Sequence, residues 1–100
     1  MSKSSTTTKA ELLHNPHPGD VLLLDLLEPL GISQNALARA IDVSPRRINE
    51  IVHGKRAISA DTDLRLARYF SLSEGYFLRL QAAYDLMEEK RKLGSRLDAI

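Results

Sequence analysis

The side chains most able to do chemistry in this chain lie in one short stretch, residues 44–56, which reads SPRRINEIVHGKR. Guanidinium, amide and imidazole groups recur there within a few positions, and such groups donate directed hydrogen bonds and bind anions. No nucleophile, base and acid stand at a catalytic spacing, so no enzyme is predicted. These residue types favour recognition of a polar, anionic surface.

Charge is distributed unevenly along the 100 residues. The formal net charge is +1, but residues 33–56 hold five basic and two acidic residues, a net charge of +3. Residues 1–32 have a net charge of −2, and residues 57–100 are balanced. A local positive excess is typical of contact with a polyanion. A merely solvated face explains the charge equally well, so charge alone does not decide.

The composition predicts one domain with one core. Hydrophobic residues make up 43 % of the chain, and cysteine is absent, which excludes a disulfide framework and fits a reducing cytosol. No apolar run approaches the ~18 residues of a membrane-spanning helix. Residues 1–10 lack the apolar core of a signal peptide. We therefore expect a cytoplasmic location without membrane contact.

The best candidate for a metal site is the segment HNPHP, with His14 and His17. Two histidines without a third ligand make a weak site. We predict no metal and no other cofactor, and we interpret the segment as an irregular entry packed on the domain.

Start and stop signals predict five helices and no strand. The first helix is expected to begin after Pro18, to break at Glu28-Pro29 because a residue before proline avoids the helical region, and to end at Gly31. The other four helices are expected to follow serine N-caps. These caps are Ser33, Ser44, Ser59 and Ser73. The last helix is expected to run to about Lys92.

The second and third predicted helices form a recognisable pair. At the helical period, the third helix separates an apolar side from a polar side. The apolar side comprises Ile48, Ile51 and Val52, and the polar side comprises Arg46, Asn49, Glu50 and His53, with Arg47 on the flank. The second helix turns Leu37, Ala38 and Ile41 inward, and only a short turn, DVS, separates the two. This pattern predicts a helix-turn-helix unit, whose second helix enters the major groove of DNA.

The segment SQNALARAIDVSPRRINEIVHGKRAISADTDLRLARYFSLS, entered by HPGDVLLLDLLEPLGIS, resembles the helix-turn-helix of the Xre/Cro repressor class. It resembles most specifically the HigA-type antitoxins, also called VapI-like addiction-module antidotes. Asp42 and Ser71 replace glycines that are usual in this family, and EGYFLRLQ departs from its common Pro-Glu-Phe-Trp type of start to the last helix. Asp tolerates the left-handed conformation, so we expect the turn to survive.

The resemblance implies an all-α, five-helix, Cro/repressor-like domain. It implies an antitoxin that neutralises a RelE-like, mRNA-cleaving toxin of the HigB type and represses their shared operon. A stand-alone Xre-family regulator without a toxin remains the alternative, and a module that does not bind DNA is a third. A neighbouring gene for a small basic toxin would separate the first two, and DNA-binding data would separate both from the third.

The helix-turn-helix context assigns candidate DNA contacts. Arginine can bond guanine with two donors, and asparagine can bond adenine. The candidate base readers are Arg46, Arg47, Asn49 and His53. Ser44 stands at a helix N-terminus that suits phosphate; the resemblance adds Ser33, Gln34, Lys55 and Arg56 as backbone contacts. For Glu50 three readings stay open: it accepts from cytosine, braces an arginine, or repels wrong sites.

The last predicted helix has two apolar stripes. Phe77, Leu80, Tyr84 and Met87 are expected to pack on the core. The opposite stripe consists of Leu78, Ala82 and Leu86 and predicts a homodimer or partner contact, although scattered exposed leucines are also normal. A dimer would read a palindromic operator. The predicted organisation is a disordered lead-in at 1–15, the domain at 16–92 and a flexible tail at 93–100.

Overall fold

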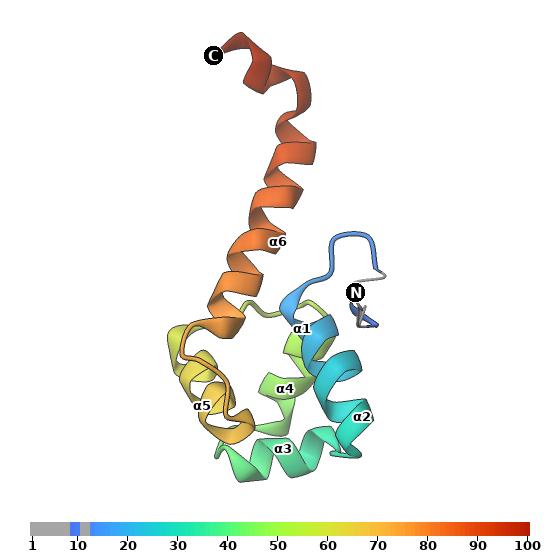
Figure 1. Ribbon diagram of the computed structural model, residues 1–100, viewed down its shortest axis with the longest axis vertical. Helices are drawn as coiled ribbons and strands as arrows, with labels where there is room; N and C mark the ends of the chain where they lie inside the picture. Colours follow the sequence, from blue (N-terminus) through green and yellow to red (C-terminus); the bar gives the residue numbers. More distant parts are fainter. Residues whose placement is uncertain (1–8, 11–12) are drawn as a thin grey trace, which may run out of the picture.

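The computed structural model describes residues 9–10 and 13–100, and within these residues the chain forms five helices without a strand (Figure 1). The predicted all-α class is therefore confirmed. Residues 1–8 and 11–12, which belong to the predicted disordered lead-in, lie outside the described residues.

The first helix is one continuous element, and the predicted break at Glu28-Pro29 is wrong. It comprises α1 (Pro18–Asp20), the π-helical segment η2 (Val21–Leu27) and α2 (Glu28–Leu30). The Glu28 N–H bonds to the Leu23 carbonyl, five residues back, and Glu28 keeps helical angles. Pro29 thus follows directly on this π-helical turn and continues the helix as part of α2. Gly31, with φ of +67°, ends the helix as predicted.

The segment before α1 is tied to two helices. The buried Ala10 donates its N–H to Asp25 Oδ1 at 3.3 Å. Asn15, with φ of +59°, donates from Nδ2 to Glu88 Oε2 on the last helix at 2.7 Å. The described part of the predicted lead-in therefore joins η2 to the far end of the chain.

The helix-turn-helix pair forms as predicted from α3 (Gln34–Ala40) and α4 (Pro45–Val52). The Ser33 hydroxyl accepts from the Ala36 N–H, and the Ser44 hydroxyl accepts from the Arg47 N–H, so both caps are confirmed. Asp42 takes the left-handed conformation of the turn, with φ of +58°. The chain thus makes the usual turn without glycine.

The start of the last helix, α6 (Tyr76–Leu93), differs from the prediction. The Ser59 cap of α5 (Ala60–Phe70) is confirmed, but Ser73 does not cap α6, whose N-cap is Gly75 with no side-chain cap of its own. The buried Asp63 carboxylate of α5 takes this role. It accepts from the N–H groups of Gly75 at 2.6 Å, Phe77 at 2.8 Å and Leu78 at 3.2 Å.

The core lies where the five helices meet. Its fully buried members come from every helix and include Leu22, Leu37, Ile48, Ile51, Leu66 and Phe77. The predicted inner faces of α3 and α4 are confirmed, because all six of their apolar residues are buried. Gly19 allows α1 to cross α4 closely: a Cβ there would lie 1.9 Å from the Ile51 carbonyl oxygen.

The last helix leaves the bundle, and its C-terminal turns extend beyond the other helices (Figure 1). Phe77 is buried, Leu80 and Tyr84 are half-buried, and Met87 is 44 % exposed. The prediction that Met87 packs on the core is therefore wrong. A 3₁₀ segment, η3 (Gly94–Ala99), follows α6, and the flexibility predicted for residues 93–100 stays a prediction.

Among the described residues, no single helix has the length and apolar character to cross a membrane. The helices Pro18–Leu30 and Gln34–Ala40 reach that length and composition only together, as a pair bent by 97°.

Candidate nucleic-acid interface

The outer side of α4 carries a row of polar side chains, here called the α4 face: Arg46, Asn49, Glu50 and His53. Ile48, Ile51 and Val52 anchor the opposite side of the helix in the core. Because both sides belong to one rigid helix, burial of the apolar side fixes the direction of the polar side. The predicted division of α4 into two sides is confirmed.

Glu50 lies between two arginines on the α4 face. Its Oε2 accepts from Arg46 Nε at 3.0 Å, and its Oε1 accepts from Arg56 Nε at 2.9 Å. The hydrogen bond from Arg56, followed by that from Arg46, holds the pKa of the Glu50 carboxyl below its usual range. Glu50 is therefore ionised, and of the three readings of this residue the geometry favours the brace.

The N-terminal end of α3 meets the α4 face. Asn49 Nδ2 donates to Gln34 Oε1 at 3.3 Å, which brings together a predicted base reader and a predicted backbone contact. This bond leaves the side-chain oxygen Oδ1 of Asn49 and the second hydrogen on Nδ2 for other partners. Such a donor and acceptor pair is what an adenine edge requires.

Two further candidate DNA contacts, His53 and Lys55, lie at the C-terminal end of α4. His53 is exposed, and its Nδ1 lies 2.9 Å from the backbone carbonyl oxygen of Asn49. When Nδ1 donates to that carbonyl, the neutral ring keeps Nε2 as an acceptor. Lys55 follows Gly54 and is exposed, and within the described residues it makes no ion pair. It can therefore reach an anion without leaving a partner.

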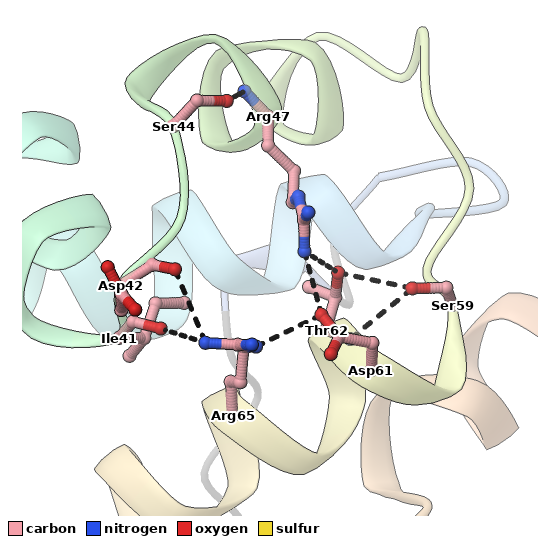
Figure 2. A network of polar contacts seen from close by, with 8 residues as sticks. All are labelled: Ile41, Asp42, Ser44, Arg47, Ser59, Asp61, Thr62 and Arg65. Carbon is pink, nitrogen blue, oxygen red and sulfur yellow. Dashed lines mark hydrogen bonds and ion pairs between the residues drawn. The ribbon is translucent and has the colours of Figure 1, made fainter.

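Arg47 has a different environment from the rest of the predicted base readers. Its Nη1 lies 2.8 Å from Asp61 Oδ2 and 3.4 Å from Thr62 Oγ1, both on α5 (Figure 2). The structure thus turns Arg47 toward α5, and its guanidinium must leave Asp61 before it can contact a base. Its role as a base reader stays a prediction.

Asp61 and Arg65 extend this contact to the turn between α3 and α4. Arg65 Nε donates to Asp61 at 3.0 Å, and its Nη1 donates to the Ile41 carbonyl at 2.7 Å and the Asp42 carbonyl at 3.3 Å (Figure 2). The hydrogen bonds from Arg65 and then Arg47 lower the pKa of the Asp61 carboxyl. One chain of polar contacts therefore joins α5 to the C-terminal end of α3 and the N-terminal end of α4.

This network was not predicted from the sequence. The four-residue spacing of Asp61 and Arg65 is a known signal for a pair on one helix face. The contacts of Arg47 with Asp61 and of Arg65 with Ile41 join residues of different helices, so no local pattern signals them.

The hydroxyls of Ser33 and Ser44, at the starts of α3 and α4, each keep an O–H donor that the cap does not use. Ser33 Oγ accepts from Ala36 N–H at 3.0 Å, and Ser44 Oγ accepts from Arg47 N–H at 3.1 Å. Each hydroxyl therefore still has its own hydrogen to donate, and a phosphate oxygen is a suitable acceptor. Both serines are exposed.

The predicted stripe on α6 is open to solvent. Leu78 is 36 % exposed, Leu86 is 65 % exposed, and Ala82 is also exposed. The core uses the other side of the helix through Phe77. The stripe is thus available for a dimer or another partner, as predicted, and its occupant stays a prediction.

The two histidines of HNPHP contact residues of helices α1 and α6. His17 Nδ1 accepts from Gly19 N–H at 3.1 Å and caps α1, and its Nε2 lies 3.3 Å from Asp20 Oδ2. His14 contacts Arg91 of α6. In the described part of the chain, no three His, Asp or Glu side chains gather as metal ligands would.

Comparisons with known proteins agree on the family. The helix-turn-helix family model matches residues 23–77. Virulence-associated protein I of Dichelobacter nodosus is 53 % identical over 77 residues, which cover 76 % of this chain and 71 % of that protein.

Solved structures give the same result, and several of them contain DNA. The Pseudomonas aeruginosa antitoxin HigA with the higBA promoter is 38 % identical, with a TM-score of 0.80 over 86 % of this chain and 94 % of that one. Antitoxin GraA in complex with its operator is 31 % identical, with a TM-score of 0.79 over 87 % of this chain and 88 % of that one. The chain therefore belongs to the Xre-type helix-turn-helix family, among relatives that include virulence-associated protein I and the HigA antitoxins.

Proposed function

We propose that this chain is a cytoplasmic antitoxin and DNA-binding transcriptional repressor. It binds a palindromic operator as a homodimer, represses its own operon and neutralises a RelE-like toxin of the HigB type. Arg46, Asn49 and His53 read base edges, and Arg47 joins them after leaving Asp61. Ser33, Gln34, Ser44, Lys55 and Arg56 contact the sugar-phosphate backbone.

One observation carries the DNA-binding part of the proposal. The α4 face presents Arg46 and Asn49 to solvent beside Gln34 of α3, on a fold that HigA and GraA share in their structures with DNA. Guanidinium and amide groups on an exposed helix are the groups that read guanine and adenine in the major groove. The +3 charge of residues 33–56 supports contact with phosphate.

The dimer follows from the amount of DNA that one helix can read. One recognition helix contacts only a few base pairs, so two copies on a two-fold axis are needed to select a site. Their recognition helices must then lie about 34–36 Å apart, one turn of DNA. The exposed stripe of Leu78, Ala82 and Leu86 is the surface that we assign to the dimer.

Two measurements on the unmodified protein test the proposal. Footprinting on the DNA upstream of its own gene should protect a palindrome. Co-expression with the product of the adjacent gene should give a stable complex and relieve the growth arrest that this product causes alone.

The outcomes separate the candidate functions. Protection of a palindrome without complex or relief of growth arrest would identify a stand-alone regulator. Absence of sequence-specific protection would contradict the repressor role, whatever the result with the neighbouring protein.

A further inference from the structure

We propose that Glu50 is a specificity-determining residue: it holds Arg46 and Arg56 in fixed positions for DNA and penalises binding where those positions do not fit. This inference rests on the proposed DNA-binding function. Of the three readings that the sequence leaves open, it combines two, the brace of an arginine and the repulsion of wrong sites, and it rejects contact with cytosine.

Both carboxylate oxygens of Glu50 contact an arginine within the protein. Oε2 accepts from Arg46 Nε at 3.0 Å. Oε1 accepts from Arg56 Nε at 2.9 Å, and Arg56 Nη2 is 2.8 Å away. Two hydrogen bonds and one further ion-pair contact thus occupy both carboxylate oxygens, so a cytosine amino group would have to share an oxygen with an arginine. Glu50 is therefore a poor base reader in this arrangement and a good brace.

The brace leaves the DNA-binding ends of both arginines available. Arg46 uses only Nε for Glu50, and in the described residues its Nη1 and Nη2 groups have no partner. These two groups lie side by side, which suits guanine O6 and N7 or a phosphate. Arg56 uses Nε and Nη2, and its Nη1 stays available for a phosphate.

The surroundings explain why the brace matters for specificity. The Arg46 side chain is 86 % exposed, whereas Glu50 is 24 % exposed. Without Glu50, Arg46 would sample many rotamers and would lose that freedom on binding. An unbraced arginine can also follow any nearby phosphate, and the lost negative charge would strengthen contact with every DNA sequence. Glu50 thus disfavours non-specific binding and favours one geometry.

Two substitutions separate the charge of Glu50 from its position. Glu50→Gln removes the charge, and Glu50→Asp keeps the charge but shortens the reach to the arginines. Glu74→Gln is the matched control, because Glu74 is exposed in the α5–α6 connection and its change in charge equals that of Glu50→Gln. Thermal melting of each variant checks that it is folded.

The measurement is the affinity of each protein for two duplexes. One is the duplex that the wild-type protein selects from a random pool, and the other is a scrambled duplex of the same composition. For Glu50→Gln, we expect the ratio of the two affinities to fall by about tenfold or more, with tighter binding of the scrambled duplex. For Glu50→Asp, we expect the ratio to fall while binding of the scrambled duplex stays within about twofold of wild type.

The control variant and three possible outcomes decide whether the inference holds. Glu74→Gln should leave the ratio unchanged. A wild-type ratio in both Glu50 variants would overturn the inference and leave the DNA-binding function intact, and so would a Glu50→Asp protein equal to wild type, since charge alone would then suffice. A wild-type protein that selects no sequence would overturn the proposed function itself and the inference with it.

Discussion

Arg46 and Arg47 are neighbours in the sequence but differ in their surroundings. The Arg46 side chain stands on the exposed α4 face beside Glu50, whereas Arg47 bonds to Asp61 and Thr62 of α5. Adjacent residues on a helix point about 100° apart, so one arginine can face a ligand while the next contacts a neighbouring helix. We therefore expect them to contribute to different properties.

Alanine substitution of each arginine tests this difference. Arg46→Ala should weaken binding to the selected duplex by on the order of 1–3 kcal/mol and change binding to scrambled DNA much less. Arg47→Ala removes a partly exposed ion pair and a contact with the buried Thr62, so it should lower the melting temperature by a few degrees. Titration calorimetry and thermal melting measure the two effects.

Two other outcomes would change the roles assigned to these arginines. If Arg47→Ala keeps the wild-type melting temperature but loses specific affinity as Arg46→Ala does, Arg47 leaves Asp61 to read a base. Equal losses on both duplexes for Arg46→Ala would mean that this arginine contacts the backbone only.

At the scale of the elements, the helix starts show two kinds of capping. Ser33, Ser44 and Ser59 each cap the helix that follows them in the chain. The start of α6 instead depends on Asp63, a residue of the middle of the domain that is 1 % exposed. The first turn of α6 is thus fixed to α5 by a carboxylate and three backbone N–H groups, which also fixes the direction of α6.

Replacement of Asp63 should therefore destabilise the domain strongly. Asp63→Ala leaves the N–H groups of Gly75, Phe77 and Leu78 without their acceptor, and we expect a loss of about 3 kcal/mol in the free energy of unfolding. Urea unfolding measures this loss, and amide hydrogen exchange should accelerate at Phe77. Asp98→Ala, in the exposed segment η3, is the control. Equal stability of the two variants would show that the Asp63 cap contributes little.

At the scale of the whole molecule, α6 carries its two sides into different environments. Its first turns pack on the core through Phe77, and its last turns extend beyond the bundle (Figure 1). A helix that leaves its domain with an exposed apolar stripe gains stability when a partner covers the stripe. Asn15 adds a contact from the N-terminal segment to Glu88, so the helix is supported along part of its outer length.

A charged double variant tests the stripe as the dimer contact. Leu78→Asp with Leu86→Asp should give a folded monomer that no longer protects a full palindrome, because two carboxylates cannot be buried unpaired in an apolar contact. Solution mass and footprinting are the measurements. Leu97→Asp with Ile100→Asp, which changes two exposed apolar residues outside the stripe, should remain a dimer. A dimeric Leu78/Leu86 variant with normal protection would place the dimer contact elsewhere and leave the stripe to a toxin or to solvent.

Local interactions are what the sequence determines by itself here. The helical period located the buried sides of α3 and α4, and three serine caps were predicted correctly because a cap hydroxyl bonds only three residues ahead. The family resemblance located the turn position at Asp42, and the tolerance of Asp for the left-handed conformation, a local property, predicted that the turn survives. These features suffice for the all-α class and for the helix-turn-helix pair.

The tertiary structure alone decided the contacts between helices. Asp63 replaces Ser73 as the cap of α6. Arg47 turns to Asp61, fourteen residues away, and Arg56 folds back from the loop onto Glu50. Each of these contacts depends on where another part of the chain lies, so no short sequence pattern predicts it. Whether a charged side chain braces a neighbour or faces DNA is set by which groups the fold brings within hydrogen-bonding distance.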